Sequence, residues 1–506
     1  MMDGRGRFTR DAAGAVAARG INYKTLWLWL LLGWTVSAAD RTLTGPVVTW
    51  MIENKVGFLA AASKPHALGG LIGGLFFAGY MLTQWPGGFL GDKYGHRTLI
   101  VVSLVWAGIA TVLSGLITGL VLFIAIRVAT GLGEGAFYSN DRSLIARETP
   151  PEKRSMGMGV VITGLAIGIT LALVFAPDLI KLGGNVLSPE DAWRMTFLVF
   201  GAATLIVGFG AWIYFRRQES GLPYLRAALH LGAYSAVSLA AVMAVYFIGD
   251  AAGLSEIAIA GLEVVLAVGM AAFIFTTKGS QSGPVVHSRD HWLIAIAFIA
   301  VLWNLWFFSF WSVSIVADAA HSSFGRSALI AAFNAGAGIL GFPAGGWLAD
   351  VAMRRGMGRK GLIVVFTVLQ CLTTVAFGYV ISGEQPSVWA MAALLFTAST
   401  FFNAMQPMAH AMLADITAPE HRGSAFGMNN LVGEIGAVLA PAVAGTLRDA
   451  TGNWTAAVYL DAALIGIAAL LFVFVREREK SHLLNGREET VAAPAAAPRE
   501  QVGATP

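Results

Sequence analysis

Apolar runs long enough to cross a lipid bilayer recur along almost all of the 506 residues. A helix of about 20 apolar residues spans the hydrocarbon core, which is about 30 Å thick. The runs are continuously apolar and do not alternate with polar residues, which favours helices over a β-barrel. Only 13% of the residues are charged, against about 25% in a typical soluble domain. We therefore expect an all-α integral membrane protein.

Fourteen of these runs are candidate membrane spans. They cover approximately residues 26–50, 67–90, 98–119, 121–146, 157–182, 193–215, 230–250, 255–276, 291–315, 325–349, 361–382, 387–414, 424–447 and 454–475. Basic residues gather before the first span, in alternate connections and from Arg476 onward, as the positive-inside rule requires of cytoplasmic segments. We expect a multi-pass protein of the cell's inner membrane with both termini in the cytoplasm, and a basic tail rather than a signal peptide at the start.

The sequence offers little for catalysis or for cofactor binding. Its single cysteine, Cys371, lies within an apolar run, which leaves neither a disulfide nor a cysteine-based metal site. The sequence contains no Walker loop, no metal-ligand spacing and no nucleophile elbow. The net charge of +4 comes mainly from loop lysines and arginines and reflects topology, not nucleic-acid binding. We expect a monomer in contact with membrane lipids that is not an enzyme and has no cofactor, metal or nucleic-acid partner.

Two sequence elements occur twice, in the same order. GGFLGDKYGHR at 87–97 is echoed by GGWLADVAMRRGMGRK at 345–360, and TPPEKRSMGMG at 149–159 is echoed by TAPEHRGSAFG at 417–427. Such repeats are typical of membrane proteins built from duplicated helical halves. We predict five segments: a cytoplasmic tail at 1–25, a six-helix half at 26–216, a linker with two additional transmembrane helices at 217–290, a second six-helix half at 291–476 and a disordered cytoplasmic tail at 477–506.

Three charged residues lie in or beside the fourth apolar run. Arg127, Glu134 and Asp141 are each seven residues from the next, and seven residues at about 100° each return to nearly the same direction. They therefore share one face of a helix. A charge in hydrocarbon costs about 2.5 to 3.5 kcal/mol on insertion scales, so we expect this face to point into a water-filled cavity or at a partner.

The repeated turn after the second span has the chemistry of a gate. Its glycines let two helix ends approach closely, while Asp92 can accept hydrogen bonds from a helix N-terminus and pair with Arg97. We expect this contact to hold the cytoplasmic side closed in one of two states. The corresponding gating residues in the repeat and in the second repeated element are Asp350, Arg354, Arg154 and Arg422.

These turns, together with Arg127 and the glycines at 131, 133 and 135, resemble the signature motifs of the major facilitator superfamily over the whole chain except 217–290 and the tail. Within it, AADRT at 38–42, YMLTQWPGGFLGDKYG at 80–95, GLGEGAFYSN at 131–140 and GMNNLVGEIGAVLAPAVAG at 427–445 are similar to the anion:cation symporter family. That family includes organic-acid, sugar-acid and phosphate-linked proton symporters. The resemblance implies two six-helix halves that work by alternating access. The two additional apolar runs between the halves bring the total to about 14 transmembrane helices.

The resemblance also implies roles for individual residues. Asp40 and Glu134 would bind and release the coupling proton, and Arg41 would meet a carboxylate of the substrate. Arg127 would belong to the substrate site as the ion-pair partner that resets Glu134. The alternative is that Asp40–Arg41 and Arg127–Glu134 are static pairs that only hold helices together.

Further polar residues fall where the family lines its pocket. Tyr80 and Asn430 would contact the substrate, unless they only satisfy the backbone, and Asn304 would be the one polar group in an aromatic wall of the site. Glu434 stands where the family usually has Asn, so it would be a second proton site or suit a zwitterionic substrate, unless it bonds a helix neighbour. Leu165 replaces a polar side chain of sugar-acid members. An aromatic run would either form a wall of the cavity or pack against other helices: Trp303, Trp306, Phe307, Phe310 and Trp311.

Together these features predict a secondary active transporter that couples protons to the symport of a small organic anion. The anion would be a carboxylate, and it could be aromatic or zwitterionic. One alternative is a spinster-like carrier of lysolipids or lipids, which shares the Asp-Arg pair of the first span. Others are a proton-driven exporter of drugs or metabolites and a non-transporting receptor. The added pair of helices at 230–276 resembles neither half, and we expect a peripheral hairpin that contacts lipid or a second copy.

Overall fold

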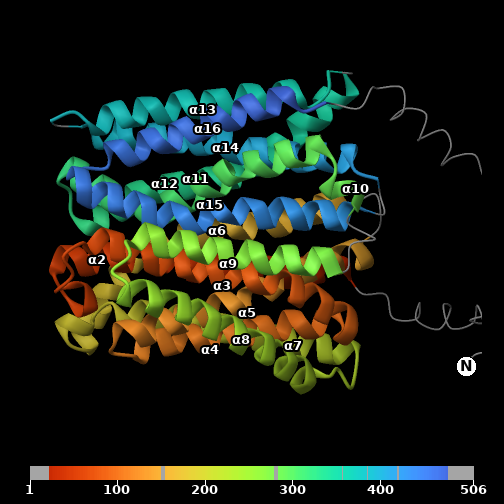
Figure 1. Ribbon diagram of the computed structural model, residues 1–506, viewed down its shortest axis with the longest axis horizontal. Helices are drawn as coiled ribbons and strands as arrows, with labels where there is room; N and C mark the ends of the chain where they lie inside the picture. The colour runs from red at the N-terminus through yellow and green to blue at the C-terminus, as the bar shows by residue number, and fades with distance from the viewer. Residues whose placement is uncertain are drawn as a thin grey trace, which may run out of the picture.

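The computed structural model describes residues 22–149, 154–277, 283–355, 357–384, 386–418 and 421–476. Every regular element within these ranges is a helix, and the helices form one bundle (Figure 1). Fourteen of the described helices have between 20 and 33 residues. They are α2 (Tyr23–Asn54), α3 (Pro65–Tyr94), α4 (His96–Leu116), α5 (Leu120–Glu148), α6 (Arg154–Val186), α7 (Arg194–Gln218), α8 (Tyr224–Ala251), α9 (Glu256–Thr277), α11 (Arg289–Ala320), α12 (Phe324–Arg354), α13 (Lys360–Ile381), α14 (Val388–Ile416), α15 (Arg422–Thr451) and α16 (Thr455–Phe474).

Length and hydropathy identify twelve of these helices as candidate membrane spans within the described part of the chain. The other two are α2 and α9. In α2 the charged residues Asp40 and Arg41 interrupt the apolar sequence and lower its mean hydropathy. A helix rises about 1.5 Å per residue, so even the shortest of the fourteen is about 30 Å long. The prediction of an all-α membrane protein with about fourteen spans is confirmed.

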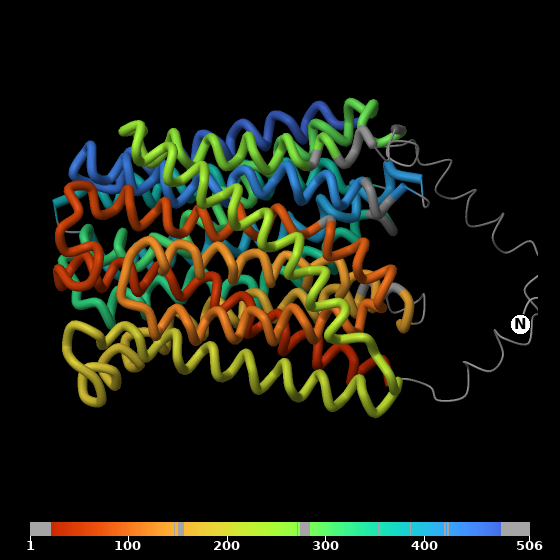
Figure 2. Tube along the Cα trace, turned by 60° about the horizontal axis from the view of Figure 1, so that its bottom comes forward, coloured from red at the N-terminus to blue at the C-terminus, as the bar shows by residue number. Residues whose placement is uncertain are grey.

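Short connections join helices that run in opposite directions, so the loops gather at two ends of the bundle (Figures 1 and 2). We call the end where α2 begins and α16 ends the tail end, and the opposite end the far end. At the tail end the indole of Trp27 donates to the hydroxyl of Thr149 at 3.0 Å. His291 contacts Thr417 in the same way at 2.7 Å. The two contacts join the start of one helix to the end of another in each repeat.

The two sets of six helices have the same neighbours. The helix α2 packs on α6, α3 on α5 and α4 on α7, just as α11 packs on α15, α12 on α14 and α13 on α16. The halves meet chiefly where α3 packs on α15 and where α6 packs on α12. These two contacts are equivalent, because α3 corresponds to α12 and α6 corresponds to α15 in the repeat. This is the arrangement that a duplicated six-helix half predicts.

The added helices α8 and α9 lie on the outside of the bundle, as expected for a hairpin between the halves (Figure 1). The helix α8 packs on α3, α4 and α5, whereas α9 packs on both α3 and α15 and so lies across the seam between the halves. Their outer faces carry exposed apolar side chains such as Val237 and Val265, which suits contact with lipid. The pair is therefore more than an appendage, because α9 touches both halves.

Several helices approach so closely that only glycine fits between them. A Cβ on Gly131 of α5 would lie 2.1 Å from the carbonyl oxygen of Phe76 in α3. At the seam, a Cβ on Gly70 of α3 would lie 2.1 Å from the carbonyl oxygen of Pro441 in α15. Small residues permit such backbone contact in membranes, where van der Waals packing drives helix association.

Replacing Gly131 with valine should lower the unfolding temperature of the purified protein, because α3 and α5 must separate to admit the side chain. Overpacking of this kind costs about 1 to 3 kcal/mol. The matched control is Gly427→Val, since nothing lies within 4 Å of a Cβ at Gly427. Equal unfolding temperatures for the two variants would contradict the close contact.

Candidate functional site

The three charged residues that share one face of α5, Arg127, Glu134 and Asp141, form a charged stripe that lies against α2. Arg127 contacts Asp40, Glu134 contacts Arg41, and the indole of Trp34 donates to Asp141 at 2.7 Å. The stripe therefore points at a partner helix, one of the two outcomes expected from its spacing. These charged groups are buried, so their mutual contacts replace water.

Arg127 and Asp40 form a fully buried pair in the N-terminal half. The Nη1 of Arg127 lies 3.1 Å from Oδ1 of Asp40, and its Nη2 donates to the main-chain oxygen of Asp40 at 3.2 Å. The hydroxyl of Thr111 donates to the same Oδ1 at 2.8 Å. The guanidinium also lies over the ring of Phe76, 4.9 Å from its centre. Side chains of two other helices, α4 and α5, thus hold Asp40 in place.

Arg41 and Glu134 form the second buried pair. The Nε of Arg41 lies 2.5 Å from Oε2 of Glu134, and the hydroxyl of Ser37 donates to the same oxygen at 2.6 Å. The other oxygen of Glu134 is buried and has no hydrogen-bond partner among the described residues. The guanidinium of Arg41 lies over the ring of Tyr80 at 4.3 Å, as a cation–π contact.

The prediction that Arg127 is the ion-pair partner of Glu134 is wrong for this structure, as is a static pair between Asp40 and Arg41. Arg127 and Glu134 lie two turns apart on one helix, about 10 Å along its axis, which is too far for direct contact. The neighbouring helix supplies both partners instead, because Asp40 and Arg41 project from α2 toward successive levels of α5.

The C-terminal half faces Arg41 with a carboxylate of its own. Glu434 of α15 accepts hydrogen bonds from Gln84 at 3.5 Å and from Asn430 at 3.4 Å, and Asn430 also donates to Gln84 at 2.9 Å. Glu434 lies within electrostatic range of both Arg41 and Tyr80. We call the cluster of Arg41, Tyr80, Gln84, Glu134, Asn430 and Glu434 the central cluster. It joins α2, α3 and α5 of one half to α15 of the other.

Sequence reasoning placed five of these residues in the site but missed Gln84. The signal was present, since Gln84 is the polar residue that precedes Trp85 and Pro86 in the motif that carried the family resemblance. The side chain of Glu434 keeps one oxygen buried and without a partner in the described ranges. Glu434 is thus hydrogen-bonded to a helix neighbour yet not fully satisfied.

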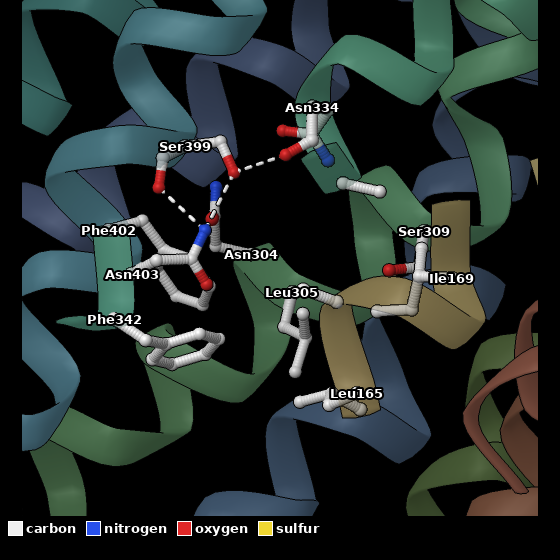
Figure 3. Close-up of a pocket in the computed structure, with 12 residues that line it drawn as sticks. Leu165, Ile169, Asn304, Leu305, Ser309, Asn334, Phe342, Ser399, Phe402 and Asn403 are labelled. Atoms are coloured by element: carbon white, nitrogen blue, oxygen red, sulfur yellow. Dashed lines mark hydrogen bonds between the residues drawn. The ribbon is translucent and has the colours of Figure 1, made fainter. Parts of the chain in front are cut away.

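A hollow lies between α6 of one half and α11, α12 and α14 of the other (Figure 3). Leu165 and Ile169 form its wall on the N-terminal half, and polar groups face them from the other half. Those polar groups are Asn304, Ser309, Asn334, Ser399 and Asn403. Asn304 therefore lines a cavity, but Arg41 is not among the residues that line it. The amide of Asn304 donates a hydrogen bond to Asp461 of α16 at 2.7 Å.

The aromatic run of α11 packs and does not line this hollow. All five of its side chains are buried, and the indole of Trp311 donates to the carbonyl of Pro441 at 2.9 Å. Trp306 lies against Phe77 of the other half, with ring centres 4.5 Å apart. The aromatic side chains therefore help to join the halves toward the far end.

The expected gate between Asp92 and Arg97 does not form. Asp92 is 80% exposed and contacts only His96 among the described ion-pair partners, at 3.5 Å. Arg97 pairs with Glu148 at 2.8 Å and with Glu219 at 3.1 Å instead. Gly95, with φ of +90°, turns the chain between α3 and α4, so that Arg97 points toward the ends of α5 and α7 while Asp92 stays on an outer face. The side chains of Asp350, Arg354, Arg154 and Arg422 lie outside those that the structure describes.

The two halves are in close contact at the far end. The ring of His66 in α3 lies 2.7 Å from Oδ1 of Asp449 in α15, and the main-chain N–H of Ala67 donates to the other oxygen at 2.8 Å. A Cβ on Gly445 would lie 2.2 Å from the carbonyl oxygen of His66. Each described ion pair at the tail end joins residues of a single half, as in Arg359 with Asp415. Among the ion pairs of the described residues, the one that joins the two halves, His66 with Asp449, thus lies at the far end.

Comparison with known proteins agrees with this architecture. A family model described as Major Facilitator Superfamily matches residues 30–355 and 292–504. A probable sulfoacetate transporter of Cupriavidus necator is 25% identical over 417 residues, which cover 80% of this chain and 84% of that protein. A chloroplastic probable anion transporter 6 of Arabidopsis thaliana is 32% identical over 151 residues, which cover 30% of this chain and 27% of that protein. A bacterial homologue of the human lysosomal transporter Spinster, in an inward-facing and occupied conformation, superposes with a TM-score of 0.67 at 16% identity over 90% of this chain and 97% of its own.

Replacing Asp449 with asparagine should open the far end, because the carboxylate that joins α15 to His66 and Ala67 is weakened. Spin labels at Lys64→Cys and Asn453→Cys, two exposed far-end positions in different halves, would report the distance. We expect Asp449→Asn to add a longer component to the distance distribution. The matched control is Asp191→Asn, because Asp191 also lies at the far end but pairs with Arg194 of its own half at 2.6 Å. Identical distributions in both variants would contradict a closing role for Asp449.

Proposed function

Because the chain belongs to the Major Facilitator Superfamily, a family of membrane transporters, we propose that it is a proton-coupled symporter of a small organic anion. The chain is a multi-pass membrane transporter and not an enzyme. Relatives that are named as sulfoacetate and anion transporters support an anionic cargo. The likeness to the Spinster homologue is at 16% identity and concerns the fold alone.

The observation that carries the proposal is the contact between Arg41 and Glu134 at the centre of the molecule. An arginine buried in a membrane must be paired, and the best ligand for a guanidinium is a carboxylate. A substrate carboxylate would therefore compete with Glu134 for Arg41. The competition ends in favour of the substrate only if Glu134 loses its charge.

A proton on Glu134 provides that loss. With Glu134 ionised, the charges of Arg41 and Glu134 cancel, so the empty site has no net charge to attract an anion. With Glu134 protonated, Arg41 becomes an unpaired buried cation, a costly state that an arriving anion relieves. Protonated Glu134, Arg41 and a monovalent anion again sum to zero charge, which lets the halves rock without carrying net charge through the membrane. Binding of the anion and of the proton thus become mutually dependent.

The rest of the central cluster would define the substrate. Tyr80, Gln84 and Asn430 offer hydrogen bonds around Arg41, and Asn430 belongs to the opposite half, so a bound anion would draw the halves together. Glu434 would be a second proton site or would receive a positive group of a zwitterion. Asp40, which is held by Arg127 and Thr111, remains a second candidate for proton coupling and would act by positioning the neighbouring Arg41.

The sidedness follows from the basic loops. We propose that the tail end faces the cytoplasm, that both termini are cytoplasmic and that the protein resides in the inner membrane as a monomer. With the far end closed by His66 and Asp449, this conformation would offer its site toward the cytoplasm. The gate at the tail end, with Asp92, Arg97 and their counterparts in the repeat, would close only in the opposite state.

Glu134→Gln should abolish accumulation of the anion against its gradient in proteoliposomes, while exchange of internal for external anion continues. A glutamine at this position is permanently neutral, so the site binds the anion but cannot release a proton. The control is Glu148→Gln, on the same helix at the tail end, which should accumulate as wild type does. Proton-driven accumulation by Glu134→Gln would remove this residue from the coupling role.

Arg41→Ala should weaken binding of the anion by about tenfold or more, since a hydrogen bond to a charged group contributes about 1.5 to 3 kcal/mol. Sulfoacetate, short dicarboxylates and aromatic carboxylates would be screened first by thermal stabilisation of the wild type, with lysolipids included to test a lipid carrier. Binding of the best anion would then be compared in Arg41→Ala and in the far-end variant Arg194→Ala. Equal affinity in both variants rules out the contact with Arg41, and stabilisation by lysolipids alone rules out the anion symporter.

A further inference from the structure

A second buried carboxylate lies in the C-terminal half, away from the central cluster. Asp461 of α16 is 0% exposed, and its Oδ2 accepts a hydrogen bond from the amide of Asn304 at 2.7 Å. Its Oδ1 is buried and has no hydrogen-bond partner in the described part of the chain. None of the ion pairs in the described part of the chain includes Asp461, whereas Asp40 and Glu134 each contact an arginine. Asp461 is thus a membrane-buried carboxylate whose charge no described side chain balances.

Comparison of the two repeated halves shows which residue stands where the first half has Arg127. In the N-terminal half, Asp40 of α2, Thr111 of α4 and Arg127 of α5 meet. The corresponding helices of the second half, at nearly the same offset along the chain, carry Asn304, Thr374 and Leu395. An apolar residue therefore replaces the arginine, and the carboxylate enters from α16 instead.

Asn304, Thr374 and Leu395 line a second hollow, which lies in the C-terminal half. Asn334 and Ser399 also line it, together with further apolar residues. The hydroxyl oxygen of Thr374 is buried and has no hydrogen-bond partner within the described ranges. Figure 3 shows Asn304, Asn334 and Ser399 gathered on one side of the neighbouring hollow. Asn304 thus connects the two features, because it lines the hollow with Thr374 and donates a hydrogen bond to Asp461.

Physical chemistry limits what this arrangement can hold. An isolated carboxylate buried in a low-dielectric interior costs several kcal/mol unless it takes up a proton or pairs with a cation. Calcium and magnesium prefer more carboxylates or more water than one aspartate behind an asparagine supplies. An organic cation would need the carboxylate in the open wall of the cavity, whereas Asp461 lies behind Asn304. A small monovalent cation satisfies these conditions.

We propose that Asp461, Asn304 and Thr374 form a binding site for a small monovalent cation, a sodium ion or a proton, in the C-terminal half. Naming it a second coupling site rests on the transport function proposed above, whereas the binding of the cation itself does not. Each half would then carry one carboxylate-based site at the equivalent depth. In the first half the cation is a fixed arginine, and in the second it is exchangeable.

The first test measures thermal unfolding of the full-length protein by tryptophan fluorescence, without any transported anion. Sodium chloride replaces choline chloride at constant ionic strength, at about pH 6 and about pH 8.5. Wild type is compared with Asp461→Asn and with Glu263→Gln, which alters another fully buried carboxylate, on α9, whose oxygens also have no partner among the described residues. We expect wild type and Glu263→Gln to gain about 3 °C or more from sodium or from the lower pH, and Asp461→Asn to lose that gain.

The two cations give different results. A gain from sodium that is largest at the higher pH and absent in Asp461→Asn identifies a sodium site. A gain from acid alone that is absent in Asp461→Asn identifies a proton site. Equal responses of wild type and Asp461→Asn to both conditions overturn the proposal. Because no anion is present, this outcome is separate from any failure of the symport mechanism.

A second test needs no variant and so does not depend on the folding of Asp461→Asn. A hydrophobic carbodiimide reacts with protonated carboxyl groups inside membrane proteins, and mass spectrometry locates the modified residue. We expect Asp461 of the wild type to be modified at low pH and to be protected by sodium, for a sodium site, or by raising the pH alone, for a proton site. Modification of Asp461 that responds to neither condition, or no modification at all, contradicts the proposal.

Discussion

The interaction on which the structure depends is the pairing of buried charges between α2 and α5. Two carboxylates and two arginines lie inside a bundle surrounded by lipid, and each is held by an opposite charge on the other helix. Breaking such a pair by removing one partner leaves an uncompensated buried charge, which costs about 3 to 5 kcal/mol. The Asp40–Arg127 pair has additional bonds from Thr111 and the main chain, which suits a fixed role. Glu134 keeps one oxygen without a partner in the described chain, which suits a group that changes its bonds.

The seam between the halves turns a local change at Glu134 into a movement of the whole molecule. Toward the far end, glycines bring the backbones of α3 and α15 into contact, and His66 with Asp449 adds a charged contact. Nearer the centre, the contact between the halves is polar and runs through Gln84, Asn430 and Glu434. A ligand that binds between Arg41 and Asn430 touches both halves, so its binding free energy can favour one arrangement of the halves over the other. The helix α9 crosses the same seam and must tolerate that movement.

Much of this was predictable because the membrane imposes simple rules. Span lengths follow from bilayer thickness, and the seven-residue spacing of Arg127, Glu134 and Asp141 placed all three against a partner helix. Which carboxylate meets which arginine was not predictable, because Asp40 and Arg41 are adjacent and their levels depend on how α2 crosses α5. The expected pair of Asp92 with Arg97 failed for a similar reason, since the alternative partners of Arg97 come from two other helices. Asp461 was missed although a lone acidic residue in the last apolar run is a signal in itself.

The central claim is that an anion displaces Glu134 from Arg41 only when Glu134 takes up a proton. The most direct measurement is the pH change of a weakly buffered solution when the stabilising anion is added to the purified protein. The account predicts uptake of about one proton for each anion bound, at a pH where the free site is ionised, and loss of that uptake in Glu134→Gln. Anion binding by the wild type with no uptake of protons would contradict it.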